Sequence, residues 1–309
     1  MSTKMYTSRM TAVAVMLLYS VPGFLLIRSR LVRQEAIPAF ATVLMYVCQP
    51  CLTVYSFQKA EFSAQLAGEL LLFFLTALVL QSVMLGAFYL IFRRKFSDIK
   101  YRIGTIATTL GNCTFMGVPL LEALFPEHPE TIVFSLAYFL AMSVLSWTAA
   151  SYIITQNRKY ISIRKLFLNP AMLSMLFTIP IWAAGFQLPA QLDSTVTLLG
   201  KMTTPLCMLV LGMRLGTVRL LPIFTSGLSY FVIGIKQLAT PLLVFLVTLV
   251  LPLDTVTKQT MFILAATPVA SVVLNFAEML GEGQETAANV VLLGTLLSIL
   301  TIPAVSLLL

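Results

Sequence analysis

Ten apolar runs follow one another along the 309-residue chain, and each is long enough to cross a bilayer. The hydrocarbon core is about 30 Å thick and needs roughly 20 residues of helix. Because backbone polar groups inside lipid must be satisfied within the protein, we expect each run to be helical. Numbered as spans 1 to 10, the runs are Thr11–Ile27, Ile37–Phe57, Leu70–Phe92, Ile103–Leu124, Thr131–Thr155, Leu168–Phe186, Val196–Met213, Tyr230–Leu251, Gln259–Leu280 and Ala287–Leu309.

The composition supports a membrane protein. Hydrophobic residues make up 59% of the chain, charged residues make up 10%, and the mean hydropathy is +0.93. An ordinary soluble domain carries about 25% charged residues. This shortage of charge excludes an ordinary cytosolic enzyme, a secreted disulfide scaffold and a disordered chain. We therefore expect one all-α integral membrane domain over residues 1–309.

The net charge of +8 is dispersed over short loops, which argues against a nucleic-acid partner. Of the 20 basic residues, 14 lie in the loops that join spans 1 and 2, 3 and 4, 5 and 6, and 7 and 8. The other face has four, namely Lys4, Arg9, Lys59 and Lys258. Because cytoplasmic loops collect lysine and arginine, the first face is predicted to be cytoplasmic and both termini to lie outside.

The cysteines and the histidine exclude several kinds of chemistry. All four cysteines lie in predicted spans, and Cys48 and Cys51 have a C-x-x-C spacing without the soluble βαβ unit of a redox protein. The single histidine, His128, lies in a predicted outer loop. We expect no metal site, no cofactor and no histidine-based catalytic triad, and therefore no enzyme.

Two sequence matches at nearly the same offset indicate an internal repeat. Pro50 in span 2 matches Pro205 in span 7, 155 residues later, and Glu122 in span 4 matches Glu278 in span 9, 156 residues later. Each half then holds five spans, an odd number, so the second half must enter the membrane from the opposite face. The sequence predicts two inverted five-helix repeats, 1–157 and 158–309, an architecture of many secondary transporters.

Spans 4 and 9 both carry helix-breaking residues near the predicted bilayer midplane. Span 4 has Gly111 and Asn112 at this depth, and span 9 has Pro268. Backbone groups that a break releases must be buried in protein or line a cavity. Each second half-helix also presents free N–H groups and about half a positive charge at its N-terminus. Two such ends at one depth, together with the Asn112 amide, predict an anion site.

Lys236 is the one basic residue that lies well inside a span, seven residues into span 8. This depth indicates a substrate or ion pathway, but a lysine about 10 Å from its helix start can also extend to the interface. Its counterpart at offset 155 is Gln81, which is also polar and favours the cavity. Lys201 and Arg214 lie near predicted helix ends, where anchoring at the interface is expected. No carboxylate lies at the midplane, so no proton-carrying acid is predicted.

The segment Leu110–Leu121 resembles the Asn-x-x-x-x-Met-Gly-Ile-Pro-Leu segment of the auxin efflux carrier family, which includes plant auxin exporters and bacterial carriers for malate, malonate and related acids. Gly111 stands where plant members have proline, and the long cytoplasmic loop of plant exporters is absent between Thr155 and Leu168. A small bacterial carrier is therefore indicated. Further segments similar to the family are Pro50, Pro205–Gly212, Ala266–Ala270, Asn275–Glu278 and Val290–Ser298.

The resemblance implies a scaffold of helices 1, 2, 6 and 7 and a moving bundle of helices 3–5 and 8–10, with substrate held where helices 4 and 9 cross. The family's asparagine corresponds to Asn112 and its helix 9 proline to Pro268. The residues expected to contact substrate are Asn112, Cys113, Thr114, Pro268, Val269, Ser271, Lys236, Gln81, Gln49 and Asn275. The residues expected at hinges or the crossover are Gly111, Gly117, Pro119, Pro50 and Pro205.

The leading hypothesis is a secondary active or facilitative carrier that moves a small organic anion, such as malate or malonate, across a bacterial inner membrane by alternating access. Its partners are expected to be that anion and the lipid bilayer, with protons or sodium as candidate coupling ions and a homodimer as a candidate assembly. One alternative is a cation/proton exchanger of related fold, which the absence of a midplane acid disfavours. Another is a membrane sensor that does not transport.

Overall fold

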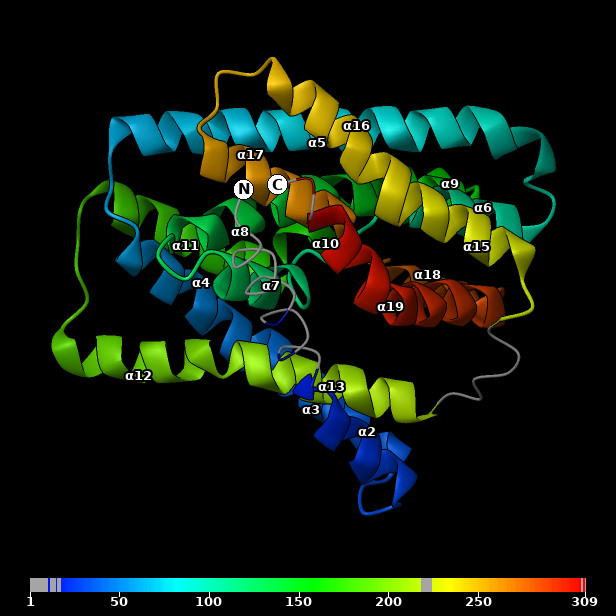
Figure 1. Cartoon of the computed structure of the whole chain (residues 1–309), viewed down its shortest axis with the longest axis horizontal. Helices are drawn as coiled ribbons and strands as arrows, with labels where there is room; N and C mark the ends of the chain where they lie inside the picture. The colour runs from blue at the N-terminus through cyan, green and yellow to red at the C-terminus, as the bar shows by residue number, and fades with distance from the viewer. Residues whose placement is uncertain (1–10, 12–14, 16–17, 218–223, 307, 309) are drawn as a thin grey trace.

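The computed structural model describes residues 11, 15, 18–217, 224–306 and 308, and these residues form helices with no named strand. Part of predicted span 1, together with Lys4, Arg9 and Arg219, lies outside the described residues. Figure 1 shows the long helix α5 along one edge of the molecule and α12 and α13 along the opposite edge, with shorter helices between them.

The helices are bounded as follows, with the 3-10 and π turns labelled η. In the first half they are α2 (Val21–Arg28), η1 (Gln34–Ala36), α3 (Ile37–Val43), η2 (Leu44–Cys48), α4 (Gln49–Lys59), α5 (Ala64–Phe92), η3 (Arg93–Lys95), α6 (Ile99–Ala107), α7 (Gly117–Leu124), α8 (Glu130–Leu145), η4 (Ser146–Ala150) and α9 (Ser151–Thr155). In the second half they are η5 (Arg158–Tyr160), α10 (Ile163–Phe167), α11 (Pro170–Ala183), α12 (Ala190–Lys201), α13 (Thr203–Thr217), α15 (Gly227–Gly234), η6 (Ile235–Ala239), α16 (Thr240–Leu249), α17 (Thr255–Ala266), α18 (Val272–Leu280) and α19 (Gln284–Ser306).

Six helical segments among the described residues are long and apolar enough to cross a membrane. A seventh forms if Arg158–Phe167 and Pro170–Ala183, which are bent by 45°, are one span. The total of ten spans stays a prediction, because spans 4 and 9 are divided into short helices and span 1 is only partly described. The six segments, which cover predicted spans 2, 3, 5, 7, 8 and 10, are Gln34–Lys59, Ala64–Lys95, Glu130–Thr155, Ala190–Thr217, Gly227–Leu249 and Gln284–Ser306.

The helix breaks predicted in spans 4 and 9 are present. The first separates α6 from α7 over residues 108–116, and the second separates α17 from α18 over residues 267–271. Gly111, Asn112 and Pro268 all lie within these breaks. Each predicted span thus becomes two half-helices joined by a short non-helical segment.

Two helices widen into a five-residue π turn immediately before an X-Pro pair. The turn η2 is followed by Gln49 and Pro50, and the turn η6 is followed by Thr240 and Pro241. Proline has no N–H to donate, and its ring clashes with the carbonyl four residues earlier. A wider turn accommodates that carbonyl, and such π turns often lie at functional sites.

The helices α2 and α13 are in direct backbone contact. A Cβ atom on Gly23 would lie 2.0 Å from the Leu209 carbonyl oxygen, and one on Gly212 would lie 1.8 Å from the Ser20 carbonyl oxygen. Small residues permit this close approach, which is how helices associate tightly in lipid.

A hydrogen bond joins α11 to the end of α4. The Trp182 Nε1–H of α11 donates to the Ala60 carbonyl at 2.5 Å.

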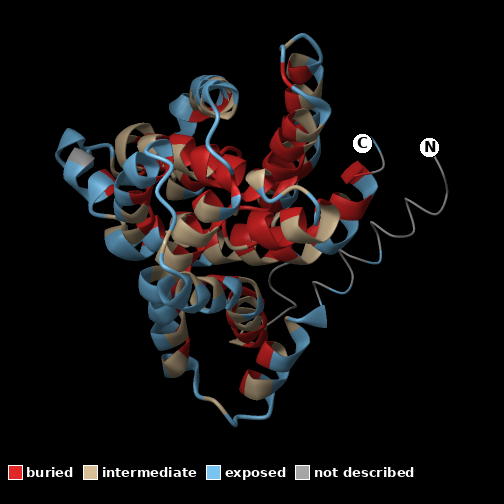
Figure 2. Ribbon diagram, turned by 90° about the vertical axis from the view of Figure 1, so that its left-hand side faces the viewer, coloured by how far each residue is buried: buried red, intermediate tan, exposed pale blue. Residues whose placement is uncertain are grey.

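Buried residues gather in the interior of the molecule, and the peripheral helices turn exposed faces outward (Figure 2). The long helix α5 illustrates this, because Leu71, Val79, Val83 and Leu90 on its outer surface are each more than half exposed. Exposed leucine and valine in such numbers are expected where the surrounding solvent is lipid.

Candidate functional site

The two broken segments cross and pair with each other through their backbones. Gly111 and Val269 form an isolated antiparallel bridge. The Asn112 N–H donates to the Pro268 carbonyl at 2.7 Å, and the Ala270 N–H donates to the Leu110 carbonyl at 2.9 Å. Helix breaks at membrane depth leave polar groups that lipid cannot satisfy. Here two hydrogen bonds between the breaks satisfy part of these groups and fix the two segments at one depth.

A cavity of about 210 Å³ lies beside this crossing. Its volume suits a small molecule, being below the range of drug-sized sites. The crossing forms one wall, and the opposite walls come from η2, α8, η4 and α13. The lining residues with polar side chains are Gln49, Asn112, Thr114, Ser143, Ser146, Asn169, Arg214, Ser271 and Asn275.

The half-helices α7 and α18 both begin at this cavity. Neither has a side-chain cap on its N-terminus. Phe115 lies in the turn before α7, and Ser271 and Val272 lie at the start of α18; all three line the cavity, and within the described part of the chain their N–H groups have no acceptor. The N-terminus of α7 itself is satisfied, because the Gly117 and Val118 N–H groups donate to the Asn112 and Thr114 carbonyls. Free N–H groups before α7 and at the N-terminus of α18 carry partial positive charge, so the wall formed by the crossing favours an anion.

Lys236 lies behind the crossing and is fully buried, in the π turn η6. Its Nζ donates a 2.6 Å hydrogen bond to the carbonyl of Ala265, in the last turn of α17. Gly111 leaves the room for it, because a Cβ atom there would lie 2.9 Å from the Lys236 Nζ and 2.8 Å from the Thr267 Oγ1. The side chain therefore does not extend to the membrane interface, and it is not part of the cavity lining.

The structure brings together most of the residues predicted to contact substrate. Six of the ten line the cavity, namely Gln49, Asn112, Cys113, Thr114, Ser271 and Asn275, and so does Gly111. The other four, Gln81, Lys236, Pro268 and Val269, do not line it. Pro268 and Val269 engage the crossing through their backbones, while Gln81 is buried on α5 with neither amide atom hydrogen-bonded.

Gly111, predicted at a hinge or the crossover, lies within the first break, and the other four residues of that prediction lie at helix starts. Gly117 is the first residue of α7, where a Cβ atom would lie 2.7 Å from the Leu264 Cδ2 of α17, and Pro119 follows in the same turn. Pro50 and Pro205 lie in the first turns of α4 and α13. Proline is tolerated in a first turn because the N–H groups there lack an intrahelical partner.

Arg214 lies near the end of its helix, as expected, because it is in the last turn of α13. The helix continues to Thr217, beyond the predicted end of span 7 at Met213. The half-buried Arg214 side chain also lines the cavity, a position that the apolar run did not indicate because it stopped at the polar arginine. Lys201 differs, since it is exposed, with its Nζ 5.8 Å from the centre of the Tyr55 ring.

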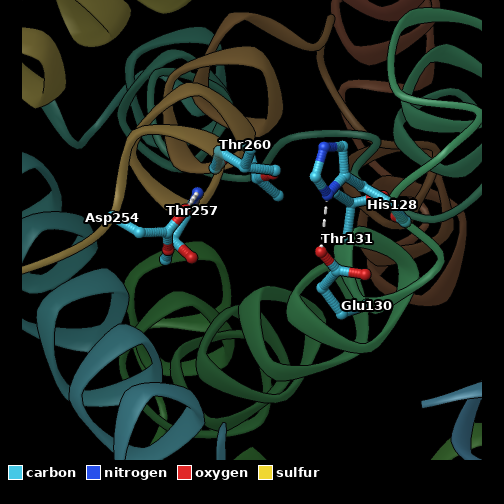
Figure 3. A network of polar contacts seen from close by, with 7 residues as sticks. His128, Glu130, Thr131, Asp254, Thr257 and Thr260 are labelled. Atoms are coloured by element: carbon cyan, nitrogen blue, oxygen red, sulfur yellow. Dashed lines mark hydrogen bonds and ion pairs between the residues drawn. The ribbon is translucent and has the colours of Figure 1, made fainter.

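A second cavity, of about 330 Å³, has an acidic lining that includes Glu61, Glu69, Glu130 and Asp254. Figure 3 shows its surroundings, with Asp254 at the start of α17 and His128 beside Glu130 at the start of α8. The His128 Nδ1 lies 2.8 Å from the Glu130 Oε1, and the Asp254 carboxylate accepts from the Thr257 N–H at 3.1 Å. The Glu130 and Asp254 carboxylates are therefore engaged in pairing and capping.

Comparison with known proteins identifies one family. A family model described as "Membrane transport protein" matches residues 8–306, which is nearly the whole chain. No curated protein matches the chain.

Proposed function

Because the chain belongs to the auxin efflux carrier family of membrane transport proteins, we propose that it carries a small organic anion across the membrane. The anion is a mono- or dicarboxylate such as malate or malonate, and the protein moves it by alternating access. The observation that carries this proposal is the crossing of the two helix breaks at the cavity. The free N–H groups of Phe115, Ser271 and Val272, together with the Asn112 amide, form a wall suited to a carboxylate.

The lining of the cavity favours an anion over a cation. None of the described residues that line it is an aspartate or a glutamate, and its one charged side chain is Arg214. A cation or proton exchanger built at this site would need an acid to hold its ion. We therefore place the anion carrier ahead of the exchanger.

The contacts between helices support movement of one bundle against another. The helices α2, α3, α4, α11, α12 and α13 pack among themselves, and α5 to α9 and α15 to α19 form the large remaining group. We assign the first group to a scaffold and the second to the moving bundle. Substrate would lie between them, because the crossing belongs to the moving bundle and Arg214 belongs to the scaffold.

The helix starts support two repeats. α6 and α17 start at residues 99 and 255, α7 and α18 at 117 and 272, and α8 and α19 at 130 and 284. These separations of 156, 155 and 154 residues agree with the offset of the sequence matches. Two inverted halves provide two states of similar energy, open to opposite faces, which is the basis of alternating access in such folds.

The cavity lies closer to the membrane face that carries the basic loops. Ala41, Asn169 and Arg214 lie near helix ends that adjoin the basic loops, and all three line the cavity. If those loops are cytoplasmic, both termini lie outside and the cavity extends toward the cytoplasm. The assignment to a bacterial inner membrane rests instead on the resemblance to small bacterial carriers, since the long loop of plant exporters is absent between Thr155 and Leu168.

Uptake of radiolabelled malonate and malate into proteoliposomes tests the proposal. We expect saturable uptake by the parent protein, which Asn112→Ala reduces at least tenfold because it removes the free amide from the crossing. Asn289→Ala is a matched control, since Asn289 is a partly buried amide of α19 outside the cavity lining. Equal uptake by the Asn112 variant and the parent protein would contradict the site, and saturable binding without flux would indicate a sensor.

A further inference from the structure

Arg214 is the one charged side chain among the described residues that line the cavity. Within the described part of the chain, its guanidinium group has no hydrogen bond and no carboxylate within ion-pair distance. Glu278 acts on it only as a more distant charge. Arginine in a partly buried position is normally paired, because an unpaired charge there loses hydration without compensation. Its five donors therefore remain available to a ligand.

Ser146 is a second unpaired donor on the same cavity. It is 2% exposed, and its hydroxyl has no hydrogen-bond partner. It begins the π turn η4 that follows α8. A buried hydroxyl without a partner is uncommon in native proteins, and one that lines a cavity is explained most simply by a polar ligand.

The helix α13 sets the distance between Arg214 and the crossing. Cys207, on the same helix, contacts the crossing segment directly, with its Sγ 3.0 Å from the Phe115 carbonyl oxygen. Arg214 follows seven residues later, which is two turns or about 10 Å along the helix axis. Because helical side chains lean toward the N-terminus of their helix, the Arg214 side chain leans back toward the crossing. A small molecule in between can meet both.

We propose that Arg214 is a specificity-determining residue that binds a second carboxylate of the substrate, so that the cavity selects dicarboxylates over monocarboxylates. One carboxylate meets the N–H groups of Phe115, Ser271 and Val272 at the crossing. The other accepts a bidentate pair of hydrogen bonds from the Arg214 guanidinium and one from the Ser146 hydroxyl. The planar fork of arginine matches a carboxylate in a way that lysine does not.

This inference rests on the anion carrier proposed above and is tested by binding to the purified full-length protein. The probes are malonate and succinate, each compared with its half-amide, malonamate or succinamate, in which a neutral amide replaces one carboxylate. We expect the parent protein to bind a dicarboxylate at least tenfold more tightly than its half-amide, the size expected for charge-assisted hydrogen bonds. Isothermal titration calorimetry measures both dissociation constants.

Arg214→Gln should remove this preference. Its affinity for the dicarboxylate should fall about tenfold or more while its affinity for the half-amide changes less than about twofold, because only one partner loses a charge-assisted contact. Arg214→Lys should keep part of the preference, and Ser146→Ala should weaken dicarboxylate binding a few-fold. Arg94→Gln is the matched control, since Arg94 is an exposed arginine in η3 outside the cavity lining.

Three results would contradict the inference. If Arg214→Gln binds the dicarboxylate as tightly as Arg94→Gln does, Arg214 makes no contact and the carrier proposal still stands. If the variant loses dicarboxylate and half-amide affinity equally, its role is structural. If the parent protein binds none of the four probes and transports no organic anion, the proposed function fails, and this inference fails with it.

Discussion

Substitution of Gly111 by alanine tests how tightly the crossing is packed. The added Cβ atom would lie 2.8 Å from the Thr267 Oγ1, 2.9 Å from the Lys236 Nζ and 3.0 Å from the Lys236 Cε. Contacts this short require the lysine or the crossing segment to move. Overpacking of a core costs about 1–3 kcal/mol. Displacing the lysine also weakens its 2.6 Å hydrogen bond to the Ala265 carbonyl.

The expected loss of stability is about 2–4 kcal/mol, because the loss of a hydrogen bond, about 1 kcal/mol, adds to the cost of overpacking. At about 2–4 °C per kcal/mol for a large domain, the apparent Tm should fall by about 4–16 °C. The assay is thermal unfolding of the purified protein in detergent, followed by intrinsic fluorescence. Gly68→Ala is the matched control, because a Cβ atom on that α5 glycine meets no atom within 4 Å.

A double-mutant cycle attributes the effect to the lysine. In a Lys236→Ala background the Gly111→Ala substitution should cost at least about 1 kcal/mol less than in the parent protein, because residues in contact show coupling of about 0.5–3 kcal/mol. If Gly111→Ala is tolerated as well as Gly68→Ala, or if the two substitutions are additive, the packing described for the crossing is wrong.

Two further substitutions probe the proposed scaffold. Gly212→Ala in α13 should lower the apparent Tm more than Gly111→Ala does, because its Cβ atom would overlap the Ser20 carbonyl group, which is backbone and cannot rotate away. The matched control is Gly86→Ala, whose Cβ atom meets nothing within 4 Å. Equal Tm values for these two variants would contradict the close approach of α2 and α13. Trp182→Phe keeps an aromatic ring beside Phe57 and Phe62 but leaves the Ala60 carbonyl without its donor, so we expect a loss of about 1–3 kcal/mol in thermal unfolding. An unchanged Tm would show that water replaces the indole N–H.

The sequence was informative about the crossing because its signals are local. Gly111, Asn112 and Pro268 interrupt apolar runs that would otherwise be continuous, and the structure breaks both helices at these residues. The pairing of Asn112 with Pro268 and of Leu110 with Ala270 could not be predicted, because it depends on how two distant segments align in space.

The far wall of the cavity was harder to predict from the sequence. Arg214 closed an apolar run, and hydropathy alone places such a residue at the interface, although α13 carries it onto the cavity wall. For Lys236 the sequence predicted the depth in the membrane but not the direction of the side chain. That direction is set by the space beside Gly111. Side-chain direction follows from tertiary packing, which a single sequence does not reveal.

Counterflow in proteoliposomes tests the central claim most directly, because it requires both an anion site and alternation of access. Vesicles that contain the protein are loaded with unlabelled malonate and diluted into a trace of labelled malonate. We expect a transient accumulation of label above its equilibrium level, absent from unloaded vesicles and strongly reduced for Asn112→Ala. Uptake that does not respond to internal malonate, or label that never exceeds equilibrium, would contradict a carrier that presents the crossing to one face at a time.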